Sequence, residues 1–364
     1  MANQVTPMPT RLGTRELAST PLRVAAFTGG ETVSSRRFRV QQYLPYLRKL
    51  GVEVNEYIAY FGSWPPPQKL ARSFWLAATL LDRIPSVAQS HDYDVTLLQR
   101  EMVSTLVTLE RWTHRPRVLD LDDAVWLNRG AEKRFARLVG MCDGVICGNS
   151  FIAEYVHKLQ NNLIVLATPV DTDRFRPRAN DTRSPRKLII GWAGLSSGFK
   201  YLRAIEDALV NVLDRYKDAV VRVVSDRKPG FRQLDGVRLE YIPWSPENEV
   251  TTIQEMSVGL MPIDDSLWSR GKCSYKMLLY MACGVPVVVS PFGMNREVLA
   301  LGQPGLGATN DRSWSECVSW LLDNPEKARQ MGVAGRRTVE EHFSLRASAP
   351  RLAAFLKGAC HCVA

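Results

Sequence analysis

The sequence predicts an α/β protein made of two domains, each built on a parallel sheet. Short apolar runs of strand length recur along the chain, and segments long enough to form helices separate them. Between residues 168 and 185 the composition shifts to Pro, Asp, Arg, Asn and Ser, as in an interdomain linker. The length of 364 residues also suits about two domains of ordinary size.

The first domain opens with a strand, a helix and a second strand. An initial apolar run ends at Gly29 and Gly30, apolar residues then recur at helical spacing from Phe38 to Leu50, and Gly51 stops the helix. This βαβ opening implies parallel strands. The strands expected in this domain are 22–27, 52–57, 95–98, 118–121 and 145–147.

A second α/β series follows the linker. Its first strand leads into a helix expected at about 200–215. The strands expected here are 188–192, 219–224, 238–241, 258–261 and 285–289. The resulting division is a flexible N-terminus at 1–20, a first domain at 21–170, a linker at 171–186, a second domain at 187–343, and a final helix with a tail at 344–364.

Composition and charge narrow the functional classes. A hydrophobic fraction of 45% and a charged fraction of 23% are typical of a globular protein. The net charge of +10 suits nucleic acid, an anionic membrane surface or small polyanionic substrates such as nucleotide diphosphates. We find no zinc finger, RNA-recognition signature or basic heptad region, so we expect no nucleic-acid partner.

The cysteines and apolar segments bear on the compartment. Seven cysteines form no familiar zinc pattern, which favours reduced thiols in a cytoplasmic protein. The first twenty residues lack the apolar core of a secretory signal. The apolar patch at 74–81 is too short to cross a bilayer, and it fits either a core helix or a peripheral contact with the inner face of a membrane. The sequence predicts no oligomeric state.

The strongest candidate for a ligand site runs from Arg270 to Glu297. Cations and a serine lie at the start of an amphipathic helix, whose positive dipole end already favours an anion such as a diphosphate. These residues are Arg270, Lys272, Ser274 and Lys276. A weaker phosphate-binding signal is the loop with Gly194 and Ser196, followed by Lys200, because it fits an ordinary turn equally well.

The stretch 276–289 closely resembles the donor-site helix and strand of GT-B glycosyltransferases of family 4, the retaining "glycosyl transferases group 1" proteins. Its residues read K-M-L-L-Y-M-A-C-G-V-P-V-V-V. Three further segments resemble the family in the same order, namely 36–51, the linker 168–175 and the strand 190–194. The resemblance covers nearly the whole chain.

This resemblance implies two Rossmann-like, doubly wound domains that face a central cleft. The second domain would hold a nucleotide-diphosphate sugar and the first an acceptor, with retention of the anomeric configuration and no metal or cofactor. The acceptor would be a glycan, a lipid-linked molecule or a small molecule. A final helix beginning after Ser344 would cross back to the first domain.

Carried over by position, Lys200 matches a lysine that contacts the donor phosphates, and Lys272 and Lys276 lie beside the phosphate and nucleoside. The loop with Gly293, Met294, Asn295 and Glu297 matches the loop that holds the sugar. We expect Lys200, Lys272, Glu297 and Asp122 to take part in catalysis, with the cations stabilising the departing diphosphate. The residues expected on the acceptor side are Gly29, Gly30, Arg39, Arg100 and Asp122.

Two positions depart from the family pattern. Two glutamates are usually present with seven residues between them, whereas this chain has Gly271 and Leu279, and leucine cannot accept a hydrogen bond from the ribose hydroxyls. A histidine near the sugar is replaced at about its position by Asp122, within an Asp-Leu-Asp-Asp run. The Asp-x-Asp spacing leaves open a metal site of the GT-A kind.

Three interpretations of function follow. The leading one is a retaining hexosyltransferase of polysaccharide, glycolipid or secondary-metabolite assembly. A rival with the same fold is a nucleotide-sugar epimerase. The third is a non-catalytic member that binds a glycan or a partner enzyme, because both glutamates are missing.

Overall fold

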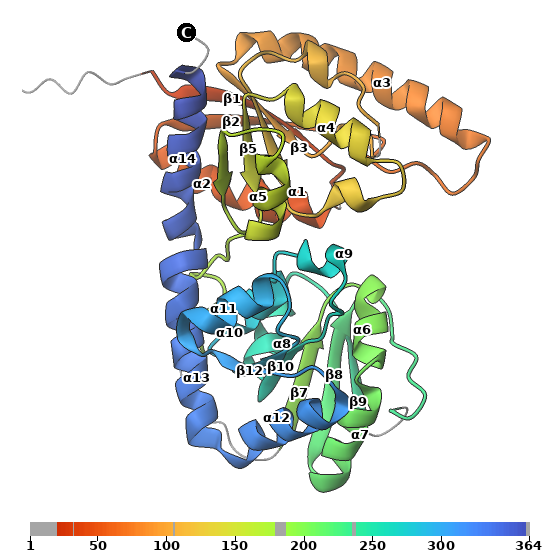
Figure 1. Ribbon diagram of the computed structural model, residues 1–364, viewed down its shortest axis with the longest axis vertical. Helices are drawn as coiled ribbons and strands as arrows, with labels where there is room; N and C mark the ends of the chain where they lie inside the picture. Colours follow the sequence, from red (N-terminus) through yellow and green to blue (C-terminus); the bar gives the residue numbers. More distant parts are fainter. Residues whose placement is uncertain (1–19, 32, 105, 179–186, 235–237, 362–364) are drawn as a thin grey trace, which may run out of the picture.

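The computed structural model describes residues 20–31, 33–104, 106–178, 187–234 and 238–361. These residues form two α/β domains, with the last helices running alongside both (Figure 1). The expected N-terminal segment 1–20, apart from its last residue, and the second half of the expected linker lie outside the described residues.

The sheet of the first domain has six parallel strands in the order β2-β1-β3-β4-β5-β6. Sequence neighbours lie on opposite sides of β1, so the sheet is doubly wound with its switch between β1 and β3. Strands β3, β4 and β5 are buried along their whole length. The bounds are β1 (Leu22–Thr28), β2 (Val52–Ile58), β3 (Val95–Gln99), β4 (Arg117–Leu121), β5 (Gly144–Cys147) and β6 (Leu163–Val165).

The sheet of the second domain repeats this plan in the order β12-β11-β10-β7-β8-β9, again with six parallel strands. Its switch lies between β7 and β10. The bounds are β7 (Leu188–Ala193), β8 (Ala219–Ser225), β9 (Leu239–Pro243), β10 (Val258–Met261), β11 (Val287–Val289) and β12 (Gly305–Gly307). The predicted fold class, two doubly wound parallel-sheet domains, is therefore confirmed.

Helices cover both faces of each sheet. The first domain has α1 (Ser34–Arg39), α2 (Leu44–Lys49), α3 (Ala71–Gln89), α4 (Glu132–Gly140) and α5 (Ser150–His157). The second has α6 (Phe199–Arg203), α7 (Glu206–Arg215), α8 (Glu249–Gln254), α9 (Leu267–Arg270), α10 (Tyr275–Ala282), α11 (Met294–Gly302), α12 (Asp311–Asp323) and α13 (Pro325–Thr338). No helix among the described residues has the length and apolar character that crossing a bilayer requires.

Two helices expected as single pieces are divided. The helix expected from Phe38 to Leu50 breaks at Val40, and α2 begins with Pro45 in its first turn. Proline has no amide hydrogen, so a continuous helix through this position would lose a hydrogen bond and clash with the preceding turn. The helix expected at 200–215 also divides, into α6 and α7, because Ile205 leaves helical geometry.

The last helix, α14 (Leu345–His361), returns to the first domain and lies along it in Figure 1. Its apolar side chains, including Leu352 and Leu356, share a buried cluster with strands β1, β3 and β4. Ser344 accepts a hydrogen bond from the amide of Ala347 at 3.1 Å and so caps the helix. Val170 pairs with Ser344 in a short parallel bridge, so both chain crossings between the domains lie side by side.

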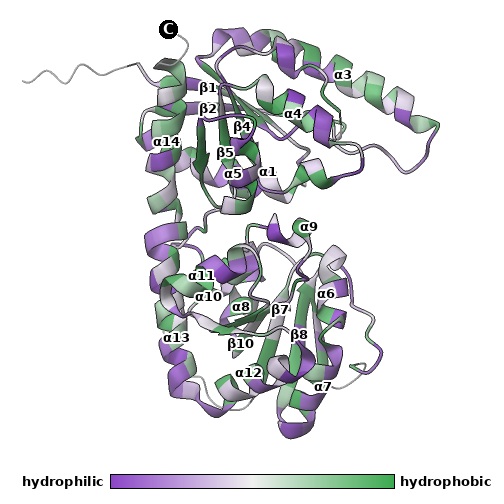
Figure 2. Ribbon diagram, viewed as in Figure 1, coloured by the Kyte–Doolittle hydropathy of each residue, from purple (hydrophilic) through white to green (hydrophobic). Residues whose placement is uncertain are grey.

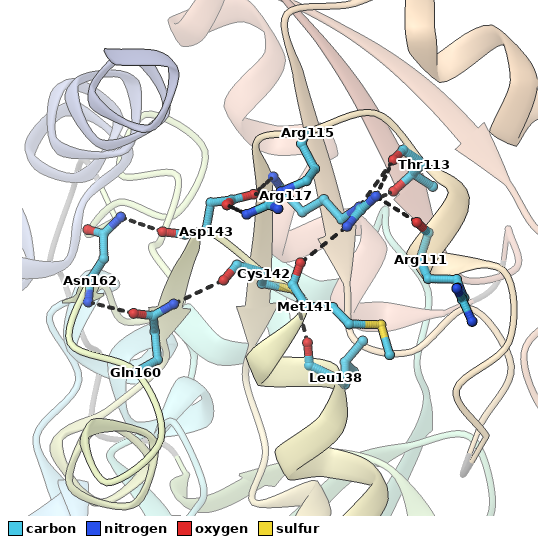
Figure 3. A network of polar contacts seen from close by, with 10 residues as sticks. All are labelled: Arg111, Thr113, Arg115, Arg117, Leu138, Met141, Cys142, Asp143, Gln160 and Asn162. Carbon is cyan, nitrogen blue, oxygen red and sulfur yellow. Dashed lines mark hydrogen bonds and ion pairs between the residues drawn. The ribbon is translucent and has the colours of Figure 1, made fainter. Parts of the chain in front are cut away.

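A polar network ties the first sheet together at the amino-terminal ends of β4 and β5 (Figure 3). Arg117 is buried and donates to the carbonyl oxygens of Arg111 at 2.7 Å, Met141 at 3.3 Å and Thr113. Asp143 accepts from the backbone amide of Arg117 at 2.8 Å. The network lies at the end of the sheet that faces away from the second domain, so we expect it to stabilise the fold of the first domain.

Replacing Arg117 with methionine should lower the free energy of unfolding by about 2 kcal/mol, because buried carbonyl groups lose their donor. Chemical denaturation measures this change. The control is Arg312→Met, whose 87% exposed side chain only pairs with Glu316 one helical turn away; it should change stability by less than about 0.5 kcal/mol. Equal effects from the two substitutions would contradict the role given to Arg117.

Candidate active site

The carboxyl ends of the two sheets face each other. Three segments that follow strands of the first domain contact the second domain, at Arg37 after β1, Asp123 after β4 and Asn149 after β5. Their partners are Glu249, which follows β9, and Lys272, which follows β10. Loops at the carboxyl ends of parallel strands are where such folds bind ligands, so this domain boundary is the candidate site.

The loop after β7 and the helix α6 that follows it hold three of the predicted donor-binding residues. Ser196 is engaged within the second domain, because its amide and hydroxyl both donate to Asp226, at 2.6 and 2.8 Å. A Cβ atom at Gly194 would collide with the side chain of Lys276, so only glycine leaves room for that lysine. Lys200 lies in α6, with its ammonium 4.5 Å from the ring centre of Tyr201.

The cations near the start of α10 lie against aromatic rings. The ammonium of Lys276 is 5.5 Å from the ring centre of Trp192, and that of Lys272 is 4.7 Å from Trp268. Burial and, to a smaller extent, the neighbouring Lys272 cation together lower the pKa of Lys276 to about 8. Within the described chain Lys276 forms no ion pair, so it is a half-buried cation that an anionic ligand would stabilise.

The predicted sugar-holding loop is packed against the start of α10. Ser274 donates to Asn295 at 2.7 Å, and Asn295 donates to the carbonyl oxygen of Ser290 at 3.0 Å. Asn295 and Met294 are both buried, so their side chains hold the loop rather than face outward. Gly293 has a positive φ of 51°, and a Cβ there would lie 2.8 Å from the backbone of Arg270.

Arg270 and Glu297, at the two ends of the proposed donor segment, are both engaged. The guanidinium of Arg270 forms a bidentate pair with Asp265, at 2.8 and 3.0 Å. Glu297 accepts a hydrogen bond from Ser150 of the first domain. Both pairs are at exposed positions, where replacing one partner with a ligand group costs little free energy.

Among the predicted acceptor-binding residues, Arg39 forms only contacts within the first domain. Its guanidinium forms a bidentate ion pair with Asp120 and donates to the carbonyl oxygen of Leu166 at 2.8 Å. Both partners of the pair are buried. The predicted acceptor contact therefore lies inside the first domain, where it links α1 to β4 and the end of β6. Gly29 and Gly30 are buried, Gly29 against Val33 and Gly30 against the loop that follows β2.

Arg100 organises the carboxylates of the predicted catalytic loop. It donates to Asp122 at 2.6 Å and to Asp123 at 2.7 Å, and its own backbone has a positive φ of 60°. Burial would raise the pKa of the Asp122 carboxyl, but the guanidinium groups of Arg100 and Arg39 outweigh it and hold that pKa below its ordinary value. Asp122 is therefore an ionised hydrogen-bond acceptor. Asp120 and Asp122, which gave the Asp-x-Asp spacing, both bind guanidinium groups.

Sequence reasoning missed the residues that join the domains. Asp123 binds the ammonium of Lys272 at 2.7 Å. Asn149 caps α5 through its side-chain oxygen, and its amide nitrogen donates to the carbonyl oxygens of Arg270 and Lys272 at 3.3 and 3.0 Å. The Asn-Ser pair after the β5 run is a recognisable capping signal, whereas its second role depends on where the other domain lies.

A further cluster at this boundary surrounds Glu249. This buried carboxylate pairs with Arg37 of the first domain at 2.9 Å and with Arg174 of the linker at 3.0 Å. The guanidinium of Arg37 also lies 5.6 Å from the ring centre of the half-exposed Trp244. No local pattern in the sequence indicated this set.

The structure explains both positions of the missing glutamates. A Cβ at Gly271 would lie 2.5 Å from the Cβ of Ala124, so any side chain there would prevent the present contact between the domains. Leu279 is buried in the core of the second domain. Neither position can present a carboxylate to a ribose.

The comparisons identify the second domain. Residues 187–324 match the family described as Glycosyl transferases group 1. The second domain is a glycosyl transferases group 1 domain. This confirms the resemblance of residues 276–289 to glycosyl transferases group 1, and the whole chain has the GT-B fold. HepE from Anabaena, solved in complex with UDP and glucose, superimposes with a TM-score of 0.69 at 12% identity, over 93% of this chain and 100% of that chain.

Two curated relatives match parts of the chain. Spore coat protein SA of Bacillus subtilis is 24% identical over 182 residues, which are 46% of this chain and 48% of that protein. The GDP-mannose-dependent alpha-(1-6)-phosphatidylinositol monomannoside mannosyltransferase of Mycolicibacterium smegmatis is 37% identical over 79 residues, 21% of each chain. The chain thus spans at most about half the length of the curated relatives it matches.

Lys272→Ala and Lys276→Ala should each weaken nucleotide binding to the group 1 domain by about 1.5–3 kcal/mol, because each removes a charge-assisted contact to phosphate. Calorimetry with a nucleoside diphosphate measures the loss. The control is Lys158→Ala, an exposed lysine beyond α5 that lies against Tyr155. It should bind like the parent protein, and equal losses from all three variants would count against this site.

Nucleotide affinity should fall as the pH rises through about 8. Lys276 has a pKa of about 8, so it is protonated and attracts the diphosphate below that pH, and it is neutral above it. Loss of one required proton gives a decline of up to about tenfold per pH unit above the pKa. Titration of the dissociation constant between pH 7 and 9 tests this, and Lys276→Met should flatten the profile. A parent protein with a flat profile would contradict the assignment.

Proposed function

We propose that the protein is a retaining, metal-independent glycosyltransferase that moves a sugar from a nucleotide-diphosphate sugar to a hydroxyl acceptor. The observation that carries this proposal is the half-buried Lys276, which has no ion-pair partner among the described residues and lies near Lys272 at the start of α10. This cationic position lies in the group 1 domain and at the boundary with the first domain. An anionic donor group is the ligand whose charge matches it.

The reaction breaks the bond between the anomeric carbon and a phosphate oxygen and forms a bond from the acceptor oxygen to that carbon. Negative charge develops on the departing diphosphate, and Lys272, Lys276 and Lys200 would stabilise it without a metal. Lys272 binds a carboxylate, Asp123, at 2.7 Å, and this contact with an anionic group supports the proposed role of its ammonium. The proton of the acceptor hydroxyl leaves with the diphosphate.

Two carboxylates are proposed to hold hydroxyl groups. Asp122 is kept ionised by Arg100, so it can accept a hydrogen bond from the sugar or the acceptor. Glu297 is exposed at the boundary, where a sugar hydroxyl can take the place of Ser150. When the substrate arrives, Glu297 exchanges one partner, whereas Asp122 keeps its ion pair with Arg100.

The donor and acceptor are proposed at the level of class. HepE was solved with UDP and glucose, and the mycobacterial relative is a GDP-mannose-dependent enzyme, so uridine and guanosine diphosphate sugars are both candidates for this chain. The acceptor is proposed to be a glycan, a lipid-linked molecule or a small molecule of polysaccharide, glycolipid or secondary-metabolite synthesis. We place the protein in the cytoplasm, in peripheral contact with the inner face of the membrane.

A second candidate function is a non-catalytic member that binds a glycan or a partner enzyme. It is favoured by Gly271 and Leu279, which leave no carboxylate at the two glutamate positions. An epimerase of the same shape is the third alternative. It would act on the nucleotide sugar without an acceptor.

Calorimetry against UDP-, GDP- and dTDP-sugars, in the presence of EDTA, should show binding of at least one donor. The reason is that the lysines, rather than a metal, neutralise the diphosphate. Proton NMR of the product formed with acceptor should then show the anomeric configuration of the donor.

Each alternative has its own outcome. No binding to any donor would exclude transfer and leave the non-catalytic function. Conversion of the donor sugar in the absence of acceptor would indicate the epimerase. Loss of turnover in EDTA, or an inverted product, would overturn the corresponding part of the proposal.

A further inference from the structure

The helix α3 carries a row of exposed apolar side chains. Leu70 is 91% exposed, Phe74 is 81% exposed, and Leu81 and Ile84 are also exposed. Together with Ala77 they are spaced by four, three, four and three residues, which places them on one face of the helix. We call Leu70, Phe74, Ala77, Leu81 and Ile84 the outer face. In Figure 2 hydrophobic residues recur along α3, interrupted by hydrophilic ones.

The opposite face of α3 is anchored, so the exposure of the outer face is built into the fold. Thr79, Arg83 and Val87 on that side are buried. Arg83 donates to the carbonyl oxygen of Tyr57 at 2.7 Å and to that of Thr28. These bonds join the helix to the ends of β1 and β2, and they fix which side of the helix faces outward.

The loop before α3 extends the same surface. Tyr60 is 82% exposed and Trp64 is 61% exposed. Lys69 and Arg72, at the same end of the helix, are exposed as well. Between Glu56 and Asp82 the chain contains no acidic residue, so this surface combines aromatic, aliphatic and positively charged groups. Membrane-water interfaces favour that combination.

We propose that the outer face of α3, with Tyr60 and Trp64, docks on an anionic membrane surface, where it holds the protein beside a lipid-linked acceptor. The inference deepens the proposed function and rests on it only for the acceptor. The helix lies flat in the plane of the headgroups, with the apolar side chains below and Lys69 among the lipid phosphates. The net charge of +10 adds a longer-range attraction.

The docking surface adjoins the acceptor side of the domain boundary. A Cβ at Gly30 would lie 3.3 Å from the Cα of Gly62, so the loop after β2 packs directly on the predicted acceptor-binding loop. Ser63 of the same loop accepts a hydrogen bond from the amide of Ser104 at 2.8 Å. The hydroxyl group of a lipid-linked acceptor, held among the lipid headgroups at this surface, would therefore lie close to the carboxyl end of the first sheet.

A second copy of the chain fits this face less well. Helices that pair through such a row usually carry complementary charges beside it. The residues flanking the outer face are instead uncharged: Ala71, Ser73, Ala78 and Pro85. A stable dimer also buries about 1,200 Å² or more, which is large for one face of a single helix. Uncharged flanks suit a helix that sinks into lipid.

Sedimentation with vesicles tests the proposal on the full chain. The parent protein should bind equimolar phosphatidylglycerol and phosphatidylcholine vesicles more tightly than phosphatidylcholine alone, and high salt should weaken that binding. The double variant Leu70→Ser/Phe74→Ser should lower the partition coefficient by about tenfold for each side chain removed. Lys69→Glu should weaken binding to the anionic vesicles only.

The matched control is Val333→Ser, which removes an exposed apolar side chain of α13 in the second domain. It should partition like the parent protein. The double variant should keep its nucleotide affinity and its turnover of a soluble acceptor, so membrane docking and the proposed activity can fail separately. Circular dichroism of the variant reports whether α3 stays folded.

Three results would overturn the proposal. One is a parent protein that does not bind anionic vesicles at low salt. Another is a folded double variant that binds them as the parent does. The third is a parent protein that is dimeric by light scattering and becomes monomeric in the double variant, which would assign the outer face to a second copy.

Discussion

The close approach of residues 270–273 to the first domain is the constraint on which the candidate site depends. It requires glycine at two places, because a Cβ at Gly271 would meet Ala124 and one at Gly148 would meet the sulfur of Cys273. With both side chains absent, Lys272 reaches Asp123, and Asn149 binds the backbone on either side of Gly271. The cations of α10 are thereby brought against the carboxylates of the β4 loop.

This constraint gives a physical reason for one departure from the family pattern. A glutamate at Gly271 would need the space that Ala124 occupies, so the domains could not meet as they do here. At Leu279 the reason is different, since the side chain fills the core beneath β10 and β11. A charged group there would lose its hydration without a partner. A bound nucleotide would therefore need to be held by groups other than this pair.

Local patterns predicted both sheets because buried parallel strands are nearly continuous apolar runs. Two strands were not predicted: β6 (Leu163–Val165), which has only three residues, and β12, because Gly305–Gly307 has a single apolar side chain. The division of the helix before β2 was also missed, although Pro45 marks the break. The candidate site was predictable in position but less so in detail. Ser196 and Asn295 have the right chemistry for a ligand, yet their partners Asp226 and Ser274 lie far away in sequence.

The two chain crossings bear on how the domains can move. Val170 and Ser344 are paired, so both covalent links between the domains pass through one small region at one edge of the molecule. Two strands of chain fastened together resist twisting more than a single strand does. This paired region therefore acts as a hinge at one edge of the molecule. If the domains move apart, the distance between them must increase with distance from that hinge. Such a movement would have to break the two ion pairs that Arg37 and Lys272 form with the opposite domain.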